Sequence, residues 1–424
     1  MTSISPHKTE IKTELRTPKF HESPQRKAME RLLRQGSIPG LIKFGAGSPD
    51  EASFPKELIA ELQVKVSKIS GILNYGLDAG FKPLIDILPK TLLARENRQV
   101  RVAGPENIAV TAGSQQSLFI LGLMSLRRHS KIAVGSTAYI GALDAWSWCQ
   151  PDYIVVPTDK HGVIPEELDK VFHDHPDIKF FYTGPTHQNP DGITIPLERR
   201  EQIVECSHKR EKIIIEDDPY SETSYDGKQP PPSLQSIAKD PDDVIYLWTT
   251  SKTLAPDFRI GGVVGNKEVV RKVTDVKRRM NLYTSNQSQA MVAAYLEGGY
   301  LDAHVPNIVK LYQPKRDEMH ASVEEFFPDV FECFKPGGGL FLWPHLKEGA
   351  NDLAAAFDME EIMDLAEQNG VGFIYGSPFF PNSNGEEVAM RLNFSKEQKD
   401  NIKHGIQILG RLLHEKLEEF KRSR

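Results

Sequence analysis

Short apolar runs alternate with longer amphipathic stretches through the middle of the chain, and this alternation predicts a parallel β-sheet covered by helices. Several runs, such as Ile213 to Ile215, are continuous, as expected of strands buried on both faces. We expect seven strands, at Ile108–Thr111, Lys131–Val134, Tyr153–Val156, Lys179–Tyr182, Lys212–Glu216, Val244–Trp248 and Gly261–Gly265. Helical spacing predicts helices at Gln115–Arg127, Pro165–Val171, Leu197–Lys209 and Lys267–Met280.

The two ends of the chain carry different patterns. Residues 1–20 are polar and aperiodic and predict a flexible arm, which precedes a short helix from Arg26 to Arg34. A long helical segment runs from about Pro306 to Phe326, and beyond it we expect strands at Gly339–Trp343, Val371–Ile374 and Ala389–Phe394 and helices at Met359–Gln368 and Lys396–Lys421. The chain is therefore expected to be an α/β protein. Its predicted parts are an N-terminal arm and short helix (1–35), a small-domain segment (36–50), a large domain with a mostly parallel seven-stranded sheet (51–305) and a smaller α+β domain (306–424).

Composition narrows the class of protein. The 424 residues include 52 Lys and Arg and 58 Asp and Glu, and the net charge of −6 argues against a nucleic-acid-binding protein. The longest apolar run, Ser117 to Leu126, is shorter than the roughly 20 residues that a membrane-spanning helix needs. Three widely spaced cysteines indicate neither a disulfide framework nor a thiolate zinc site. Because the first twenty residues also lack an apolar signal segment, we expect a cytoplasmic protein.

Polar residues follow several of the predicted strands, at the edge where open α/β sheets bind ligands. Gly113-Ser114-Gln115 opens a helix whose free N–H groups suit a phosphate, although Ser114 could equally be a simple helix cap. Asp217 follows a buried strand, where a carboxylate requires a cation or strong hydrogen-bond donors. A structural ion pair would satisfy Asp217 as well as a ligand would.

One lysine and one arginine lie between the last two predicted strands, in the segment from Thr249 to Gly261. A lysine held there can have its pKa lowered enough to form a Schiff base, although a solvated surface lysine is the commoner case. The guanidinium of Arg259 and the hydroxyls of Thr249 and Ser251 suit a phosphate. Lys252, Asp217, Arg259 and the helix N-terminus together match the needs of pyridoxal phosphate, which are a Schiff base, an anionic partner and phosphate anchors.

The chain resembles the fold-type I pyridoxal-phosphate-dependent aminotransferases of class I/II, and in particular the aromatic, kynurenine and 2-aminoadipate aminotransferases. The resemblance extends over nearly the whole chain after residue 20, and its most specific motif is Ser-Lys-x-x-Ala-Pro-x-x-Arg-x-Gly at residues 251–261. Supporting motifs follow in the same order as in the family, at Gly113-Ser114-Gln115, Asn189-Pro190-Asp191-Gly192, Asp217-x-Pro219-Tyr220 and Met390-Arg391-Leu392-Asn393-Phe394-Ser395.

The resemblance implies roles around the cofactor. Lys252 would form the Schiff base and carry a proton from the substrate Cα to the cofactor. Asp217 would keep the pyridine nitrogen protonated, and Tyr220 and Asn189 would hydrogen-bond the 3′ oxygen. The other implied cofactor contacts are Tyr139 on the ring face and Gly113, Ser114, Gln115, Thr249, Ser251 and Arg259 around the phosphate.

The resemblance also implies a substrate site and a homodimer. Arg391 would bind the substrate α-carboxylate as a bidentate pair, and Asn189, Ala46 and Gly47 would line the same site. Tyr75 would reach the cofactor and substrate of a partner subunit, which implies shared active sites, although ordinary packing would also explain this tyrosine. Arg26 would bind a distal acidic group of the substrate, unless it is an ordinary surface arginine.

Three positions depart from the family pattern. Thr137 stands where proline is usual, Asp257 where glycine is frequent, and Tyr375-Gly376 where Pro-Gly is usual. These departures weaken a precise substrate assignment, because the loops at Thr137 and Tyr375 are expected to border the pocket.

The expected function is transfer of an amino group between an L-amino acid, aromatic or 2-aminoadipate-like, and a 2-oxo acid. Another pyridoxal-phosphate enzyme of the same fold is the alternative, either a lyase acting at Cβ, such as a carbon–sulfur lyase, or a decarboxylating or condensing enzyme. A transcription regulator with an aminotransferase-like domain would require a basic helix-turn-helix domain, which does not suit the acidic balance of the chain.

Overall fold

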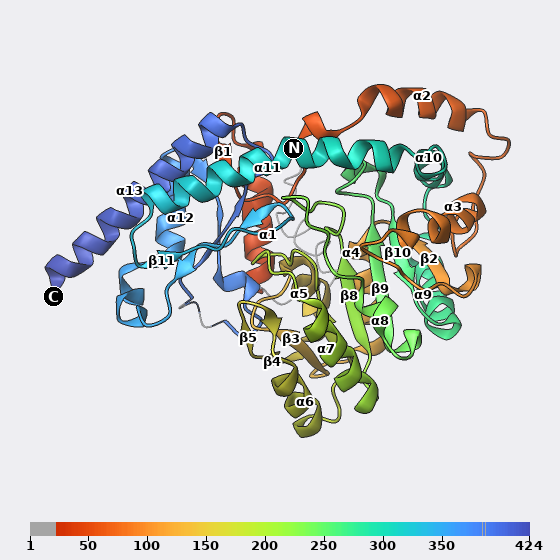
Figure 1. The fold of residues 1–424 in the computed structure, drawn as a ribbon, viewed down its shortest axis with the longest axis horizontal. Coiled ribbons are helices and arrows are strands. Elements are labelled where there is room, and N and C mark those ends of the chain that lie inside the picture. The colour runs from red at the N-terminus through yellow and green to blue at the C-terminus, as the bar shows by residue number, and fades with distance from the viewer. Residues whose placement is uncertain (1–22, 384, 386) are drawn as a thin grey trace, which may run out of the picture.

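The computed structural model describes residues 23–383, 385 and 387–424, so the arm expected at residues 1–20 lies outside the described residues. The centre of the molecule is a seven-stranded sheet whose strands are, in spatial order, β2 (Ile108–Thr111), β10 (Gly261–Val264), β9 (Val244–Thr249), β8 (Ile214–Asp218), β7 (Phe181–Thr183), β3 (Lys131–Gly135) and β4 (Asp152–Val156). β10 is antiparallel to both neighbours, and every other neighbouring pair is parallel. The predicted α/β fold with a mostly parallel seven-stranded sheet is confirmed (Figure 1).

The strand boundaries differ most from the sequence prediction at β8. We expected this strand to end at Glu216, but it continues through Asp217 and Asp218, which pair with Leu247 and Trp248 of β9. The longer neighbouring strand therefore extends the ladder over two acidic residues that have a low strand propensity of their own. This extension holds the backbone of Asp217 rigidly at the carboxyl end of the sheet.

Both faces of the sheet are buried, as the continuous apolar runs predicted. Along β9, Ile245 and Leu247 pack in one apolar cluster, while Tyr246 and Trp248 point to the opposite face and pack in another. The first cluster includes α4 (Ser114–Ser125), α5 (Ile140–Trp146) and α9 (Lys267–Asn281). The opposite face is covered by α6 (Pro165–Asp174), α7 (Leu197–Lys209), α8 (Leu234–Ile237), α2 (Lys56–Ser67), α3 (Lys82–Ile87) and α10 (Asn286–Glu297).

The sequence pattern did not predict several of these helices. In α10, nearly every residue from Gln289 to Leu296 is buried, so the helix lacks the polar face that gives a helical period its signal. In α5, Ile140 to Leu143, Ala145 and Trp146 are all buried, and the same reason applies. Helices that are apolar on all sides resemble buried strands in a sequence.

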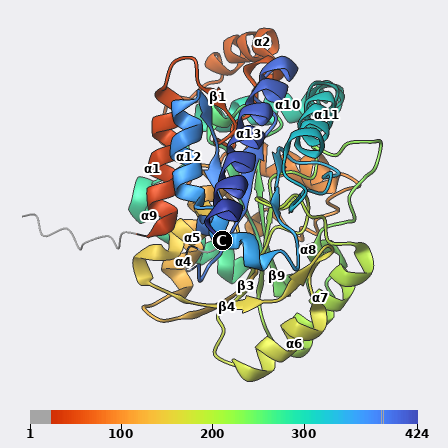
Figure 2. The ribbon, with the colours of Figure 1, turned by 90° about the vertical axis from the view of Figure 1, so that its left-hand side faces the viewer.

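A second group of elements forms what we call the small lobe, and the part built on the seven-stranded sheet is the large lobe. The small lobe has a three-stranded antiparallel sheet of β12 (Phe341–Leu342), β16 (Met390–Asn393) and β15 (Ile374–Tyr375). Its shorter pairs are β1 (Ile42–Lys43) with β14 (Val371–Gly372) and β11 (Phe331–Glu332) with β13 (His345–Leu346). Its helices are α1 (Pro24–Ser37), α12 (Met359–Gln368) and α13 (Lys399–Ser423), which lie side by side in Figure 2.

Helix α11 (Tyr300–Phe326) connects the two lobes and crosses the top of the view in Figure 1. Its first turn packs Leu301 into the core of the large lobe, whereas Tyr312 and Met319 pack into the core of the small lobe. We expected this helix to begin near Pro306, but it begins at Tyr300 and contains both Pro306 and Pro314. The predicted domain boundary at residue 305 thus falls within a continuous helix, and the boundaries of the domains stay a prediction.

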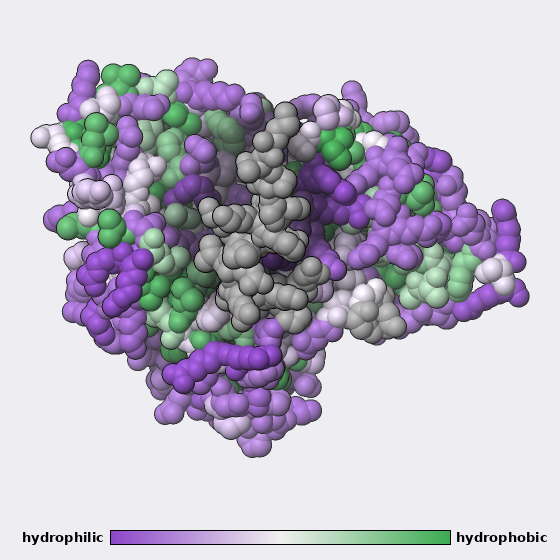
Figure 3. Space-filling view, turned by 180° about the vertical axis from the view of Figure 1, so that it is seen from behind, coloured by the Kyte–Doolittle hydropathy of each residue, from purple (hydrophilic) through white to green (hydrophobic). Residues whose placement is uncertain are grey.

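The surface seen in Figure 3 is mostly hydrophilic, with smaller hydrophobic groups between the charged side chains. Within the described part of the chain, no helix is both long enough and apolar enough to cross a membrane.

Candidate active site

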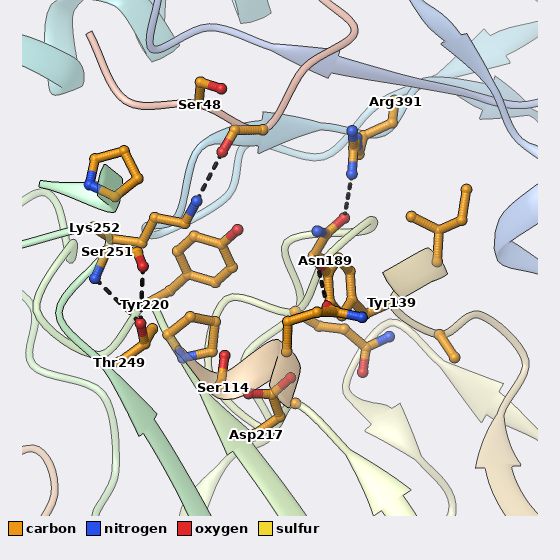
Figure 4. Close-up of a pocket in the computed structure, with 18 of the residues that line it drawn as sticks. Ser48, Ser114, Tyr139, Asn189, Asp217, Tyr220, Thr249, Ser251, Lys252 and Arg391 are labelled. Atoms are coloured by element: carbon orange, nitrogen blue, oxygen red, sulfur yellow. Dashed lines mark hydrogen bonds between the residues drawn. The ribbon is translucent and has the colours of Figure 1, made fainter. Parts of the chain in front are cut away.

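The polar residues that follow β2, β3, β7, β8 and β9 meet at one edge of the sheet, beside a cavity of about 330 Å³ between the two lobes. Figure 4 shows these side chains pointing into the cavity. The predicted residues that line it are Ala46, Gly47, Ser114, Gln115, Tyr139, Asn189, Asp217, Tyr220, Thr249, Ser251, Lys252, Arg259 and Arg391. The structure therefore brings together residues that are as far apart in sequence as Ala46 and Arg391.

Lys252 lies just after β9 and extends its amine across the cavity. Its Nζ donates a hydrogen bond to the carbonyl oxygen of Gly47 at 2.8 Å. Burial, together with the positive charges of Arg391 and Arg259, lowers the pKa of Lys252 to about 8. A substantial fraction of the amine is therefore neutral and nucleophilic near physiological pH.

Asp217 is a buried carboxyl group with a single hydrogen-bond donor among the described residues. Tyr182 donates its hydroxyl to Oδ2 at 3.0 Å, while Oδ1 is buried without a partner. Burial raises the pKa of Asp217 to about 7, and the hydrogen bond from Tyr182 opposes only part of that shift. The ion pair that the sequence left open belongs to Asp218, so Asp217 is free to face a cationic ligand group.

The end of β8, which carries Asp217, and the loop after it, which carries Tyr220, are held in place by buried ion pairs on the side away from the cavity. Arg98 forms ion pairs with Asp218 at 2.8 Å and with Glu222 at 3.0 Å, and its side chain is fully buried. The hydroxyl of Tyr246 donates to Asp218 at 2.6 Å. Because removing one member of such a network leaves uncompensated buried charge, the loop is held in one conformation.

The start of α4 and the loop before β10 form a cluster of phosphate-type donors. Arg259 donates from Nη2 to the carbonyl oxygen of Ala112 at 3.0 Å and lies against Gly113. A Cβ at Gly113 would come within 2.6 Å of that guanidinium, and its φ of +74° also favours glycine. Across the cluster, the hydroxyls of Thr249 and Ser251 are 3.0 Å apart. The α4 N-terminus adds its unpaired N–H groups.

The side chain of Gln115 is held by its neighbours. Its Nε2 donates to the carbonyl oxygen of Gly141 at 2.6 Å, and its Oε1 accepts from the hydroxyl of Tyr139 at 3.2 Å. The two hydrogen bonds fix the ring of Tyr139 at the cavity wall, where burial raises the pKa of its hydroxyl to about 12. Gln115 therefore orients Tyr139, and its backbone N–H in the first turn of α4 is the group that suits a phosphate.

Arg391 occupies the opposite side of the cavity, on β16 of the small lobe. Its Nη1 donates to Oδ1 of Asn189 at 2.9 Å and its Nη2 to the carbonyl oxygen of Gly45 at 2.7 Å, while Nε is buried without a partner. The guanidinium lies 4.3 Å from the ring centroid of Phe341 and 4.9 Å from that of Phe379. Burial lowers its pKa to about 10, so Arg391 stays charged at neutral pH.

A short segment between β1 and α2 is held to the site through its carbonyl oxygens. Arg391 binds Gly45, Asn393 binds Ala46, Lys252 binds Gly47, and Ser395 donates to Ser48 at 2.8 Å. This arrangement places Ala46 and Gly47 against the cavity, as expected from the sequence.

Three predicted site residues do not line the cavity, namely Gly113, which lies behind Arg259, and Tyr75 and Arg26, which lie on the surface. The side chain of Tyr75 is 83% exposed and contacts the ring of Tyr283 edge-on, with a centroid separation of 5.8 Å. Arg26 pairs with Glu30 at 3.0 Å on the outer side of α1, with 47% of its side chain exposed. Of the positions that depart from the family pattern, Thr137 lines the cavity, whereas Asp257 is exposed and Tyr375 lies elsewhere and donates to Glu360.

Sequence reasoning missed several residues of the site. Tyr182 is the donor to Asp217, and only its place at the end of a predicted strand could have indicated this. Gln188 and Ser48 also line the cavity, next to the motifs that were recognised. The apolar wall comes from Met29, Leu32 and Leu33 of α1 and from Ile140. No local signal marks an N-terminal helix as part of a site.

The residues present fit pyridoxal phosphate. Lys252 offers a neutral amine, the unpartnered Oδ1 of Asp217 suits a protonated ring nitrogen, and the α4 N-terminus with Thr249, Ser251 and Arg259 suits a phosphate. Arg391 is left for a carboxylate. The arrangement can thus hold an amino acid and an aldehyde cofactor on either side of one lysine.

The reactivity of Lys252 provides a first test. We expect the rate at which the cofactor-free protein forms a Schiff base with pyridoxal phosphate to rise with pH around a midpoint of about 8, because only the neutral amine attacks. Stopped-flow absorbance would give the rate, and borohydride reduction with mass spectrometry would locate the modified lysine. The exposed Lys65 serves as the internal control and should stay unmodified. A midpoint near the ordinary lysine pKa of about 10.4 would contradict the expectation.

The buried carboxyl of Asp217 provides a second test, on stability without cofactor. Its folded-state pKa of about 7 lies above the ordinary value of 3.8, so the folded chain keeps a proton that the unfolded chain has lost between these pH values. The wild-type protein should therefore lose stability as the pH rises through that window. Asp217→Asn removes the charge and should be more stable than wild type by about 2 to 4 kcal/mol at about pH 8.

Denaturant unfolding at several pH values would measure this difference, which should vanish below about pH 3, where Asp217 is protonated in both the folded and the unfolded chain. The exposed Asp177→Asn is the control, because the pKa of Asp177 is lowered by Lys131 instead of raised. A variant no more stable than wild type at the higher pH would show that Asp217 has no unfavourable charge in the folded state.

Comparison with known proteins places these observations in a family. Residues 39–409 match the family described as aminotransferase class I and II. The chain is 33% identical over 398 residues to aromatic-amino-acid aminotransferase 1 of Thermococcus litoralis, covering 92% of each protein. Its structure is similar to that of the Pyrococcus horikoshii kynurenine aminotransferase, with a TM-score of 0.85, 32% identity and coverage of 96% and 98% of the two chains. It is also similar to LysN, the α-aminoadipate aminotransferase of Thermus thermophilus, with a TM-score of 0.81, 28% identity and coverage of 92% and 95%.

The structure of LysN contains a phosphopyridoxyl amino acid, which agrees with the cofactor expected from the sequence. The expected family, fold, cofactor and enzyme class are all confirmed. The roles of single residues stay predictions that the geometry supports. The chain therefore belongs to the class I and II aminotransferases and is a pyridoxal-phosphate-dependent aminotransferase.

Proposed function

We propose that this enzyme transfers the amino group of L-amino acids with aromatic or other apolar side chains to a 2-oxo acid. The observation that supports this choice is the apolar wall of the cavity. Met29, Leu32 and Leu33 of α1 lie across from Ala138 and Ile140 and form a surface that suits a hydrophobic side chain.

The distribution of charge supports the same choice. Among the described residues, the cations that line the cavity are Lys252, Arg259 and Arg391. Lys252 is the reactive amine, and Arg259 lies beside Gly113 on the phosphate side, so Arg391 is left for the substrate α-carboxylate. A 2-aminoadipate-like substrate has a second carboxylate, and Arg26, the cation expected for it, pairs with Glu30 outside the cavity.

The reaction follows from the positions of these groups. When bound, pyridoxal phosphate supplies an aldehyde that accepts the amino group and a ring that withdraws electrons from the substrate Cα. Arg391 offers a planar fork of donors to the α-carboxylate and so fixes the orientation of Cα relative to Lys252. The neutral amine of Lys252 removes the proton from Cα, and the resulting ammonium would donate it to the cofactor carbon that receives the amino group.

The surrounding residues hold the cofactor and substrate in position and exclude water. Asp217 presents its buried Oδ1 as an acceptor for a ring N–H and, as a carboxylate, stabilises positive charge there. Asn189 hydrogen-bonds both Arg391 and Tyr220, so it joins the carboxylate side of the cavity to the cofactor side. Because Phe341 and Phe379 cover the guanidinium of Arg391, water competes poorly for its donors.

A donor panel tests this assignment. We expect kcat/KM for phenylalanine, tyrosine and leucine to exceed that for 2-aminoadipate by at least about 10-fold, because the second carboxylate would be buried without a cation. Conversion of the cofactor to its pyridoxamine form, followed by absorbance in single turnovers, is the measurement. Equal or faster turnover of 2-aminoadipate would contradict the substrate class. Release of ammonia and pyruvate without the pyridoxamine form would favour the lyase instead.

We also propose that the enzyme acts as a homodimer with shared sites. The segment from α2 to Leu77 carries exposed apolar side chains, of which Leu73 is 79% exposed and Tyr75 83%. Met280 and Leu282 add to the exposed apolar residues at the end of α9. A surface of this kind supports burial against a second copy, which would take Tyr75 into the partner's site.

Mixing two inactive variants tests the shared site. In a heterodimer of Lys252→Ala with Tyr75→Ala, one site combines an intact Lys252 with an intact Tyr75 from the other subunit. Refolding the two together should restore about a quarter of wild-type activity, since half of the dimers are mixed and one site of each works. If Tyr75 acts within its own subunit, the mixture stays inactive. Each variant refolded alone is the control, and sedimentation gives the oligomeric state.

A further inference from the structure

A buried carboxyl group, Asp191, lies behind the cavity wall and has no ion pair among the described residues. It is 8% exposed and accepts three hydrogen bonds. Its Oδ1 accepts from the backbone N–H of Ile193 at 2.9 Å. Its Oδ2 accepts from the hydroxyl of Thr137 and from Nε2 of Gln188, each at 2.7 Å. Both of these donor side chains line the cavity, so Asp191 fixes two polar groups of its wall.

These contacts determine the orientation of the Gln188 amide. A carboxylate oxygen accepts but does not donate, so the amide group 2.7 Å from Asp191 is the NH₂. The same Nε2 lies 3.2 Å from the hydroxyl oxygen and 3.4 Å from the carbonyl oxygen of Thr137. Its oxygen Oε1 must point away from this cluster, and within the described residues nothing donates to it. Since Oε1 is also not one of the buried atoms that lack a partner, it keeps some exposure, and Gln188 is one of the residues that line the cavity.

The orientation of the Gln188 amide depends on the Thr137 hydroxyl as well as on Asp191, because this hydroxyl donates to the same carboxylate oxygen, Oδ2, as Gln188. Thr137 also precedes Ala138 and Tyr139, so the polar cluster is continuous with the aromatic wall. Gln188 precedes Asn189, which binds Arg391. Gln188 therefore lines the same cavity as the residues that would hold the substrate.

We propose that Gln188, with its amide locked by Asp191 and Thr137, selects among aromatic amino acids for those whose side chain carries an O–H or N–H donor. The inference rests on the proposed function, because it refines the substrate class of the same cavity. Gln188 is the group that contacts the substrate, and Asp191 is a positioning residue that acts through it. A site that offers a hydrogen bond discriminates against an analogue that leaves its polar group unpaired.

Two substrate pairs that differ by a single donor test the proposal on the holoenzyme. Tyrosine and phenylalanine differ by one hydroxyl, and tryptophan and 1-methyltryptophan differ by one N–H. We expect kcat/KM to favour the donor-bearing member of at least one pair by about 10-fold or more. In Gln188→Met, which keeps the length of the side chain, that ratio should fall about 10-fold.

A second variant tests whether the orientation of the Gln188 amide matters, because it keeps the glutamine but reverses its amide group. In Asp191→Asn, the backbone N–H of Ile193 still needs an acceptor, so the oxygen of the new side-chain amide takes the place of Oδ1. The NH₂ group of the asparagine then takes the place of Oδ2 and faces Gln188. Gln188 must then turn its oxygen toward residue 191 and its NH₂ toward the cavity. The preference for donor-bearing substrates should fall as much as in Gln188→Met, although the glutamine is still present.

Gln235→Met is the matched control, because Gln235 is a buried glutamine that bonds Arg101 and does not line the cavity. Its substrate ratios should equal those of wild type. If both ratios in Gln188→Met equal the wild-type ratios, or if phenylalanine loses as much as tyrosine, the inference is wrong. An enzyme that converts leucine but no aromatic amino acid also refutes the inference. An enzyme that converts neither aromatic nor other apolar amino acids to their oxo acids refutes the proposed function instead, so the two failures are distinguishable.

Discussion

The active site depends on the burial of a carboxylate, Asp217, that has no cation of its own. Removing this group from water disfavours its charge, and the hydroxyl of Tyr182 compensates only in part. The surrounding structure therefore prevents Asp217 from moving out toward water. β8 extends through Asp217 by pairing with β9, and Arg98 anchors the following loop through Asp218 and Glu222. The folded chain thus holds a carboxyl group whose ionised form is unfavourable until a protonated ring nitrogen lies beside it.

The two arginines of the site have different surroundings and different expected ligands. Arg259 stays accessible beside the α4 N-terminus, whereas Arg391 is buried between two phenyl rings and retains its charge. Burial lowers the pKa of Lys252, and the positive charges of both arginines add to this effect. The two guanidinium groups therefore serve two purposes, since they provide anion sites and also favour the neutral form of the lysine amine.

The sequence predicted those parts of this arrangement that are encoded locally. The seven central strands follow from continuous apolar runs, and Lys252, Arg259 and Asp217 follow from residues placed just after strands. Tyr182, Gln188 and the wall formed by α1 depend on contacts between distant segments, so no local pattern marks them. The orientation of the Gln188 amide is even harder to predict from sequence, because it depends on hydrogen bonds from two different loops. Asp217 was recognised as needing a partner, but only the structure shows that Asp218 takes the available arginine.

Helix α11 has a mechanical consequence for the enzyme. Its 27 residues form a rod of about 40 Å that is embedded in the large lobe at one end and the small lobe at the other. Pro306 lacks an N–H group, so the carbonyl oxygen of Asp302 has no intrahelical donor. Pro306 lies between Leu301, which packs in the core of the large lobe, and Ile308, which packs in the core of the small lobe. The helix is therefore least stiff where it passes from one lobe to the other, and bending there would change the angle between the lobes while leaving both apolar cores intact.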